Sequence, residues 1–522
     1  MKREELIKKV STESKVWDMV VIGGGATGLG VALDAALRGY TVALFEQHDF
    51  AKCTSSRSTK LVHGGVRYLQ KGDVALVREA LTERGRLRHN APHLVKDQSF
   101  VIPNYTLFDN FLYTCGLTLY DMLSWGGLSL GRSLYISGEK TSRYLPTVKK
   151  KGLKGGVIYH DGQFDDSRLA INIAQSCEEN GGCPVNHMKV TGISHNKNGK
   201  VAGVTVQDLE TNTKYIVSAK SVINATGVFV DDIIQMDVPS TQRMVKPSQG
   251  VHLVFDKSFL NSDYALMIPT TSDGRVLFAV PWHDKVVVGT TDIVREHAEL
   301  EAVPLEEEIE FILQTAGLYM TRKPEKEDIL SMFAGQRPLA APKKEGKSTK
   351  EISRSHKIFV SDNNLITITG GKWTTYRRMA EDTVDKAIKL QLLQPRKCVS
   401  KNFRIHGYKP NPDLSNHMYV YGSDIPAIVE MMKSNPKMAE KIHPKYEYTV
   451  AEVVWAVREE MARSVEDVLS RRVRLLFIDA RAAMEAAGKV AEVMASEFGY
   501  DQTWIDNQIY SFRKIADNYI IK

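Results

Sequence analysis

The sequence predicts an α/β protein that begins with a parallel β-sheet and ends in a separate helical domain. Three observations lead to this fold class. Residues 16–22 are largely apolar, as in a buried strand, and run directly into three consecutive glycines. Residues 26–38 have helical spacing and residues 41–45 form a second apolar strand, so a βαβ unit of about thirty residues opens the fold. From about residue 395 onward, helical patterns replace the strands.

The composition is that of an ordinary globular protein and limits the classes of function. The chain has 522 residues, 43% of them hydrophobic and 25% charged. Because a single core stops growing at roughly 250–300 residues, we expect two or three domains. The net charge of +7 is mild for this length. It fits an anionic substrate or an anionic membrane surface, and we expect no nucleic-acid partner because no concentrated basic face is evident.

The cysteines indicate the compartment, and the absence of certain motifs argues against a metal site and a membrane-spanning helix. Five cysteines without a CxxC pair indicate reduced thiols and a cytosolic compartment. The sequence contains no metal-binding motif, so we expect no metal site. It also contains no run of about 20 uncharged apolar residues, so we expect no spanning helix.

The elements between the two ends follow from periodicity and turn signals. Residues 74–96 are helical by pattern, and their arginines are expected to form a solvated face. The later expectations are strands over most of 155–225, strands with turns over 250–292, a helix over 305–320, a strand over 359–369 and a helix from 374 onward. In the C-terminal part, Thr449 and Glu452 form a capping box, and residues 482–494 are rich in Ala; both are typical of helices.

The glycines after the first strand form a GxGxxG motif at 23–28, in the setting that a dinucleotide requires. Gly23 allows a tight turn, Gly25 allows the close approach of a pyrophosphate, and Gly28 allows the helix to pack against the strand. Glu46 ends the second strand, where its carboxylate can accept hydrogen bonds from ribose hydroxyls. The motif therefore predicts a Rossmann-like dinucleotide-binding domain, but it does not separate NAD from FAD.

The segment that follows carries a resemblance to a known family. Residues 54–69, TSSRSTKLVHGGVRYL, match almost throughout the pattern S-S-x-S-[ST]-K-L-[IV]-H-G-G-x-R-Y-L. This pattern is that of the FAD-dependent glycerol-3-phosphate dehydrogenases, in the D-amino-acid-oxidase-type group of flavoproteins. Further segments resemble the family in order: NATG at 224–227, PSQGVH at 247–252, RVLFAVPW at 275–282, GTTD at 289–292, AGQRPL at 334–339, SRSH at 353–356, GGKWTTYR at 370–377 and EDVLSRR at 466–472.

Two departures from the family pattern stand out. Val228 and Phe229 follow the NATG segment where the family usually has Pro-Trp, which puts the local packing of FAD in doubt. The long insertion of the family's oxidase branch is absent, which favours a quinone-reducing dehydrogenase over an oxygen-reducing oxidase.

The resemblance implies the architecture. It is a Rossmann-like (glutathione-reductase-like) FAD-binding domain interleaved with a β-sheet substrate-binding domain, followed by a C-terminal helical domain. The expected boundaries are 16–80, 155–235 and 355–392 for the first, 81–154 and 236–354 for the second, and 395–522 for the third.

The resemblance also implies the activity. The reaction is the oxidation of sn-glycerol 3-phosphate to dihydroxyacetone phosphate by hydride transfer to flavin N5, with electrons passed to a membrane quinone. Two alternatives stay open. One is a glycerol-3-phosphate oxidase that uses oxygen, and the other is a non-catalytic flavin-binding redox sensor or scaffold.

By the same resemblance, motif residues hold the cofactor and the substrate. Cofactor contacts are expected from Gly23, Gly25, Ala26, Thr27, Gly28, Glu46, Thr54, Ser55, Ser58, Lys60, Leu61, His63, Gly64, Ala225, Thr226, Gly227, Gly371, Lys372, Trp373 and Thr374. The substrate is expected to meet Arg67, Tyr68, Arg337, Arg354 and Lys372. A phosphate needs several cations, and Arg suits it by its bidentate fork.

Oxidation of a secondary alcohol also needs a base, and a neutral imidazole is the natural candidate near pH 7. His63 and His252 both lie in family motifs. The sequence leaves open which of them is the base, and whether either is only a structural residue. Arg337 is the third candidate catalytic residue, because its fixed charge could stabilise a developing alkoxide.

Residues 105–135 are rich in large apolar side chains and allow two interpretations. They form core of the substrate domain, or they turn an apolar face to lipid, as a monotopic enzyme needs in order to reach quinone. In the second case Lys2, Arg3, Lys8 and Lys9 would meet anionic headgroups. Since the family is typically membrane-associated, we expect a cytoplasmic protein, peripheral on the inner face of the cytoplasmic membrane. A homodimer stays open.

Overall fold

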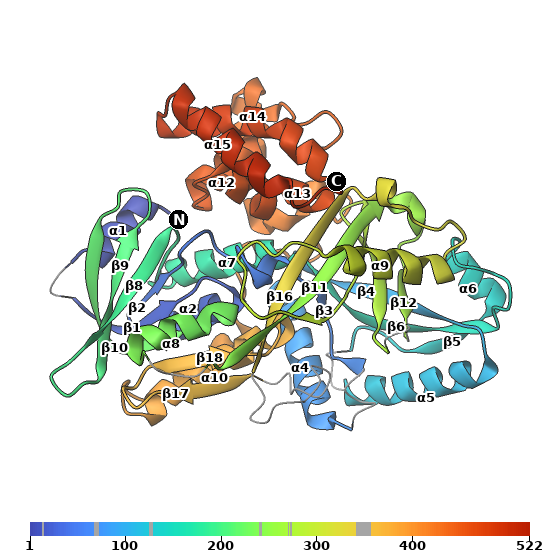
Figure 1. Ribbon diagram of the computed structural model, residues 1–522, viewed down its shortest axis with the longest axis horizontal. Helices are drawn as coiled ribbons and strands as arrows, with labels where there is room; N and C mark the ends of the chain where they lie inside the picture. Colours follow the sequence, from blue (N-terminus) through green and yellow to red (C-terminus); the bar gives the residue numbers. More distant parts are fainter. Residues whose placement is uncertain are drawn as a thin grey trace.

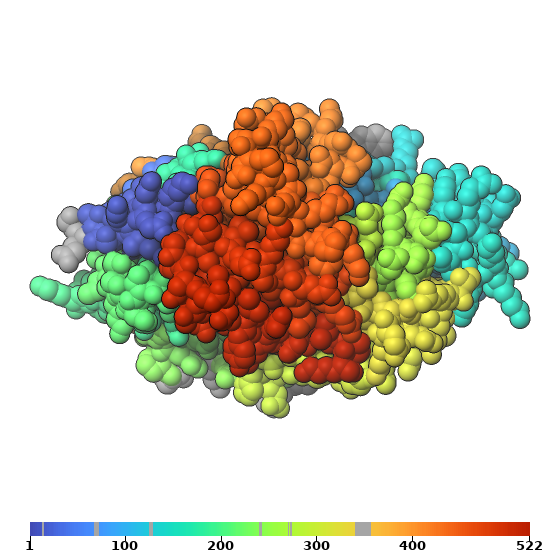
Figure 2. Space-filling view, turned by 90° about the horizontal axis from the view of Figure 1, so that it is seen from above, coloured from blue at the N-terminus to red at the C-terminus, as the bar shows by residue number. Residues whose placement is uncertain are grey.

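The computed structural model describes residues 1–12, 15–66, 72–124, 129–239, 243–269, 271, 274–340 and 356–522. Two sheets lie side by side in this part of the chain, and the C-terminal helices stand on one side of both (Figure 1). From above, the helical domain covers the middle of the molecule, and helix α1 (Arg3–Val10) lies along its flank (Figure 2). The arrangement has the α/β class and the helical C-terminal part that the sequence predicts.

The first sheet has the strand order β17-β18-β10-β1-β2-β7, and β18, β10, β1, β2 and β7 run parallel to one another. Its strands are β1 (Val16–Ile22), β2 (Val42–Phe45), β7 (Cys183–Val185), β8 (Met188–His195), β9 (Val201–Asp208), β10 (Lys214–Asn224), β17 (Lys357–Val360) and β18 (Ile366–Thr369). Its helices are α2 (Ala26–Leu37), α7 (Asp166–Glu179), α8 (Val230–Asp237) and α10 (Tyr376–Lys389). The apolar runs of β1 and β2 are buried, as expected for strands in the centre of a parallel sheet.

The second sheet has the order β15-β11-β14-β13-β12-β4-β6-β3, with β16 paired along β11 and β5 along β6. Its strands are β3 (Leu61–Val62), β4 (Val95–Asn104), β5 (Leu134–Ser137), β6 (Gly155–Phe164), β11 (Val245–Asp256), β12 (Ala265–Ile268), β13 (Leu277–Trp282), β14 (Lys285–Gly289), β15 (Ile293–Val294) and β16 (Ser331–Ala340). Helices α4 (Val74–Asn90), α5 (Leu107–Leu123), α6 (Gly138–Tyr144) and α9 (Glu306–Tyr319) belong to this half of the molecule.

The C-terminal domain contains α11 (Ile425–Ser434), α12 (Val450–Glu459), a π-helical turn (Asp467–Arg472), α13 (Leu475–Ile478), α14 (Ala480–Phe498) and α15 (Gln502–Ala516). The predicted capping box is present, because Glu452 accepts a hydrogen bond from the Thr449 N–H at 2.7 Å. The core of this domain includes Trp282 and Phe333 from the second sheet. The helical domain is therefore packed onto the second sheet rather than tethered to it.

His406 pairs with two carboxylates in the connection between α10 and α11. Its Nδ1 lies 2.5 Å from Glu179 and its Nε2 lies 2.9 Å from Asp424. Burial lowers the pKa of His406, but the hydrogen bonds and charges of the two carboxylates outweigh it and raise that pKa to about 9. The imidazole is therefore charged at neutral pH.

Strands dominate residues 155–225, as expected, but helix α7 at Asp166–Glu179 was not predicted; Asp165 caps it by accepting from the Arg168 N–H. The helix predicted over 74–96 ends at Asn90, and β4 begins at Val95. Its face is not fully solvated either, since Arg84 is 1% exposed and pairs with Asp161 at 2.6 Å.

Helix α5 decides between the two interpretations of residues 105–135. Leu117 and Tyr120 face the protein. Six large apolar side chains are instead exposed: Leu107, Phe108, Phe111, Leu112, Leu119 and Met122. The interpretation as buried core is therefore wrong for most of the helix. Among the described residues, no helix is long and apolar enough to cross a bilayer.

The basic N-terminal residues do not share this face. Arg3 is buried, and its guanidinium pairs with Asp208 at 2.7 Å. Lys2 pairs with Glu459 of the C-terminal domain at 3.1 Å. Helix α1 and helix α5 lie at opposite ends of the molecule (Figure 1). The expectation that Arg3 meets lipid headgroups was therefore wrong, and Lys8 and Lys9 are exposed on α1, at the other end of the molecule from α5 (Figure 1).

Candidate active site

The site lies where four parallel strands of the first sheet end. Ile22 at the end of β1 is in register with Phe45 of β2 and Asn224 of β10, and β18 follows at Thr367. The segments 23–28, 225–227 and 370–374, together with Glu46, therefore meet at one edge of the sheet. In open α/β sheets, ligands bind at the carboxyl ends of the strands. The topology thus brings together motifs that are far apart in the sequence.

The glycine turn has the shape that a pyrophosphate requires. Gly23 has φ +105°, and a Cβ on it would lie 2.8 Å from the Ala225 carbonyl oxygen. A Cβ on Gly28 would collide with the carbonyl oxygen of Gly23. Gly25 precedes α2 without a side-chain cap, and the Ala26 N–H donates to the Ser55 hydroxyl at 2.9 Å. The positive end of the helix is thus open toward Ser55, as at other anion-binding helix starts.

Glu46 lies at the end of β2 and is held by the backbone. Its Oε2 accepts from the Gly24 N–H at 2.6 Å and its Oε1 accepts from the His48 N–H at 2.8 Å. Burial raises the pKa of Glu46, and these two hydrogen bonds oppose that rise. Each carboxylate oxygen retains a second lone pair, so the side chain can still accept from the hydroxyls of a ribose.

Segment 54–64 is tied to the other motifs by hydrogen bonds. The Thr54 hydroxyl donates to the Gln336 carbonyl at 2.7 Å, one residue before Arg337. The Trp373 indole N–H donates to the Ser55 carbonyl at 2.8 Å. The Thr374 hydroxyl donates to the His63 carbonyl at 3.4 Å. Hydrogen bonds therefore hold the three motifs around residues 54, 337 and 373 next to one another.

The glycine pair after His63 is supported from α5. The Gly64 N–H donates to the Tyr120 hydroxyl at 2.8 Å. Tyr120 in turn donates to Asp161 at 2.9 Å, and Arg84 completes this buried network. Sequence reasoning did not identify Tyr120 or Asp161, because neither lies in a recognisable motif.

Two expected cofactor ligands point elsewhere. The Ser58 hydroxyl donates to Asp166 at 2.7 Å, and the Lys60 ammonium pairs with the same carboxylate at 2.7 Å. Lys60 is fully buried. We therefore do not propose a cofactor contact for these two side chains. Asp166 is a residue that sequence reasoning missed; the only available signal was a pair of acids directly after a strand.

Arg337 reaches across the second sheet toward this edge. Its guanidinium lies 3.3 Å from Asp292 and 3.2 Å from the Thr290 hydroxyl. It passes over Gly250, where any Cβ would collide with it. The Arg337 side chain is 26% exposed, whereas that of Asp292 is 9% exposed. The guanidinium is therefore anchored by Asp292 and Thr290 and remains partly exposed.

The two candidate histidines differ in exposure. His63 is half-buried at the end of β3. His252 is only 2% exposed, with Nε2 2.9 Å from the Thr59 hydroxyl and its ring stacked on Phe333 at 4.9 Å. Burial, followed by the charges of Lys60 and Arg337, holds the pKa of His252 well below its usual range. His252 is therefore neutral and enclosed.

Three predicted substrate ligands, Arg67, Tyr68 and Arg354, lie outside the described residues. Lys372 is described and precedes the short helix Trp373–Thr375, where its carbonyl accepts from the Thr375 N–H. Leu61 is buried in β3. Gly371 has φ +75°, and a Cβ there would collide with Met379.

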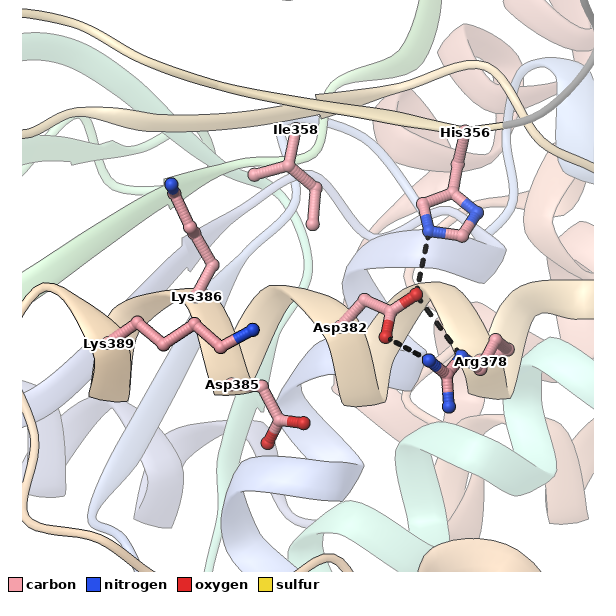
Figure 3. A pocket seen from close by; sticks show the side chains of 7 residues that line it. All are labelled: His356, Ile358, Arg378, Asp382, Asp385, Lys386 and Lys389. Carbon is pink, nitrogen blue, oxygen red and sulfur yellow. Dashed lines mark hydrogen bonds and ion pairs between the residues drawn. The ribbon is translucent and has the colours of Figure 1, made fainter.

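A separate hollow of about 350 Å³ lies beside α10 (Figure 3). In Figure 3, Asp382 lies between His356 and Arg378, and its carboxylate pairs with them at 3.0 and 2.8 Å. The hollow is open and its lining carries charges of both signs. We regard it as a surface feature behind the Gly371 turn, distinct from the candidate site.

Comparison with known proteins decides the family. Residues 18–377 match the family described as FAD dependent oxidoreductase, and residues 364–504 match the C-terminal domain of alpha-glycerophosphate oxidase. The glycerol-3-phosphate dehydrogenase of Schizosaccharomyces pombe mitochondria is 37% identical, over 97% of this chain and 87% of that protein. The chain belongs to the FAD-dependent glycerol-3-phosphate dehydrogenase family.

Other relatives agree with this assignment. The mitochondrial glycerol-3-phosphate dehydrogenase of Saccharomyces cerevisiae is 36% identical, over 96% of this chain and 89% of that protein. The solved structure of glycerol-3-phosphate dehydrogenase from Bacillus halodurans, complexed with FAD, has a TM-score of 0.81 and 28% identity, covering 100% of this chain and 98% of that one. L-alpha-glycerophosphate oxidase from Mycoplasma pneumoniae shares the fold, with a TM-score of 0.57 and 16% identity, over 74% of this chain and 98% of that one.

The residues present fit FAD, the cofactor of this family. The glycine cradle at 23–28 leaves room for a pyrophosphate, and Glu46 stands where a ribose would lie. Segments 54–64 and 370–374 extend from this cradle toward Arg337.

Proposed function

We propose that the protein oxidises sn-glycerol 3-phosphate to dihydroxyacetone phosphate and passes the electrons to a membrane quinone. The observation that carries the substrate assignment is the joining of two motifs: Thr54 in the cofactor segment is hydrogen-bonded to the strand that carries Arg337. A partly exposed guanidinium on the strand that is joined to the cofactor segment suits a phosphorylated alcohol. The three-domain boundaries expected from the sequence remain part of this proposal.

The roles of the residues follow from what the oxidation needs. FAD supplies the hydride acceptor when bound, at N5 of the flavin. As the C2–H bond of the substrate breaks, its O–H bond must also break, and the proton must reach a base. We assign this proton to His63 rather than to His252, because a base must touch the substrate and His252 is enclosed. Arg337 stabilises the negative charge that develops on the substrate oxygen.

The phosphate requires further cations. Lys372 is the second described candidate, and we propose Arg67, Tyr68 and Arg354 as partners on the strength of their motifs alone. For the cofactor we propose the glycine turn with Ala26 and Thr27, Glu46, Thr54, Ser55, Leu61, His63 and Gly64, the segment Ala225, Thr226 and Gly227, and the segment Gly371, Lys372, Trp373 and Thr374.

We further propose that α5 docks on an anionic membrane surface. Its six exposed apolar side chains form a contiguous strip on one helix, which is unusual for a surface that meets only water. Beside the start of α5, the Tyr105 hydroxyl donates to the carbonyl of Lys149, in a loop whose four lysines are exposed: Lys149, Lys150, Lys151 and Lys154. An apolar strip with a basic rim fits a bilayer with acidic headgroups.

The proposed compartment rests on the state of the cysteines. All five cysteines are unpaired, which suits a reducing compartment. We therefore propose peripheral attachment to the inner face of the cytoplasmic membrane. Whether the chain forms a homodimer is left to a measurement of its mass in detergent solution.

The test is anaerobic bleaching of the flavin by substrate. Purified yellow protein should lose its absorbance near 450 nm with glycerol 3-phosphate but not with glycerol. Arg337→Ala should prevent bleaching while FAD stays bound, and Arg322→Ala, an exposed arginine of the same half of the molecule, should bleach normally. A protein that glycerol 3-phosphate does not bleach would refute the proposal and leave the redox sensor or scaffold.

The electron acceptor needs its own measurement. Reoxidation of the reduced protein by a soluble quinone analogue should be fast, and reoxidation by oxygen should yield little hydrogen peroxide. The opposite result would identify an oxidase.

A further inference from the structure

We propose that Arg474, in the C-terminal helical domain, is a positioning residue for the reaction. Together with Asp166 and Lys60 it forms a buried charge cluster that holds segment 54–63 in its working shape. The cluster lies where the two sheets meet the helical domain. The role of segment 54–63 in the reaction rests on the proposed function. The way in which the cluster holds this segment does not.

Asp166 is the centre of the cluster and is fully buried. One carboxylate oxygen accepts from the Ser58 N–H at 3.1 Å, from the Ser58 hydroxyl at 2.7 Å and from the Lys60 ammonium at 2.7 Å. The other accepts from the Arg474 guanidinium at 2.9 Å and from the Ser167 N–H at 2.9 Å. One side of the carboxylate therefore holds the motif segment, and the other side holds the C-terminal domain.

The two cations share a second acceptor. The Ser56 carbonyl accepts from the Lys60 ammonium at 2.6 Å and from the Arg474 guanidinium at 3.2 Å. Arg474 also donates to the Ser167 hydroxyl at 2.6 Å and to its own domain at the Ser470 carbonyl at 2.9 Å. It thus bridges the helical domain, the start of α7 and the motif segment with one side chain.

Aromatic rings close the cluster. The Lys60 ammonium lies 5.1–5.2 Å from the ring centroids of Trp282, Phe333 and Phe477. The Arg474 guanidinium lies 4.5 Å from the Phe477 ring. Cations over aromatic faces are stabilised, and this site excludes water, so each charge depends on its partners.

The backbone conformation also distinguishes Lys60 and Arg474. Lys60 has φ +63° and Arg474 has φ +64°, a left-handed conformation that favours glycine. Non-glycine residues persist there only when their surroundings hold them, and such positions gather at functional sites. Both cations of the cluster adopt this left-handed conformation, in which glycine would be less strained. We infer that the side chains of Lys60 and Arg474 are needed at these positions.

The cluster also borders the buried histidine. Thr59, adjacent to Lys60, has its hydroxyl 2.9 Å from His252 Nε2. The Phe333 ring lies 5.1 Å from the Lys60 ammonium and stacks on the His252 ring at 4.9 Å, so it contacts both residues. If Lys60 moves, the turn that carries Thr59 moves with it, and so does the chain that leads to His63.

The same interface offers a matched control. Arg168 lies two residues after Asp166, is fully buried, and pairs with Glu460 of the helical domain through two bonds of 2.6 and 2.7 Å. In the described part of the chain its guanidinium makes no hydrogen bond or ion pair with segment 54–63, and it lies over the ring of Tyr421. Arg168→Met therefore breaks an ion pair of the same kind without touching the motif segment.

The experiment compares Arg474→Met with Arg168→Met. Melting temperature, the limiting rate of anaerobic flavin reduction at saturating glycerol 3-phosphate, and amide hydrogen exchange of segment 54–63 in the FAD-free protein are measured for each. Both variants should melt at lower temperature. Only Arg474→Met should slow reduction, by at least tenfold, and only it should speed exchange in segment 54–63. Arg474→Lys, which keeps the charge, should recover part of both effects.

A second variant guards against a folding defect. Arg474→Gly suits the left-handed backbone, so the turn can form without the side chain. It should slow reduction and loosen segment 54–63 as Arg474→Met does. Reduction and exchange at wild-type values in either Arg474 variant, or equal losses in Arg168→Met, would overturn the inference. A wild-type protein that glycerol 3-phosphate does not bleach would refute the proposed function alone, because the exchange measurement would still decide the role of Arg474.

Discussion

The exposed face of α5 allows a prediction whose size can be worked out. Phe108 and Phe111 are 71% and 70% exposed. A Phe side chain offers roughly 200 Å², so each leaves about 140 Å² in water. If half of that area enters lipid, each ring contributes about 1.8 kcal/mol at 25 cal/mol per Å². Replacing both with Ser should then weaken binding by about 3.5 kcal/mol, or roughly 300-fold.

The assay is co-sedimentation with vesicles that contain acidic phospholipid, over a range of lipid concentrations. The matched control is Tyr510→Ser, because Tyr510 is 72% exposed and its helix α15 lies on the opposite side of the molecule from α5 (Figure 1). Both proteins should melt within a few degrees of the wild type, since the substituted side chains have few contacts. Flavin reduction in solution should be unchanged in both.

Two results would refute the reasoning. One is a Phe108→Ser, Phe111→Ser protein that sediments with vesicles as the wild type does. The other is an equal loss of binding in Tyr510→Ser, since it would show that any exposed aromatic ring contributes and that α5 has no special role.

Three further predictions concern other parts of the molecule. Gly28→Ala should abolish FAD binding, measured as flavin retained on gel filtration, because the new Cβ would collide with the Gly23 carbonyl; retained flavin would contradict the proposed cradle. Tyr120→Phe should slow flavin reduction several-fold by leaving the Gly64 N–H with only its longer bond to Asp161 at 3.3 Å, and a wild-type rate would show that this support is dispensable. His406, whose pKa is raised to about 9, stabilises the fold fully below about pH 6.5 and loses that contribution, up to about 3 kcal/mol, as pH rises through 9. His406→Gln should therefore lower the melting temperature at pH 7 much more than at pH 10, and equal losses at both would contradict this.

Local features of the sequence were sufficient for the cofactor end of the site. The turn at Gly23, the uncapped start of α2 and the placement of Glu46 depend on residues close together in the chain. Their conformations follow from the missing Cβ atoms and from the strand that precedes them. The C-terminal helices were equally predictable, because the capping box of Thr449 and the Ala-rich run of α14 act within one or two turns.

Helix α7 was missed although its own signal was present. Asp165 is a good N-cap residue, but it stands within a range in which we expected mostly strands. The polar residues of α7 are buried as well as the apolar ones, and they depend on partners in other elements, such as Glu460 for Arg168.

The sequence by itself determined the family and the cofactor, because these depend on short motifs whose residues act locally or in known spacing. Only the tertiary structure decided which side of α5 meets the protein, which of His63 and His252 is accessible, and that Asp166 joins Lys60 to Arg474. The physical reason is that burial and charge pairing depend on surfaces that meet only after folding. Residues 166 and 474 are separated by 308 positions, and no local pattern records their contact.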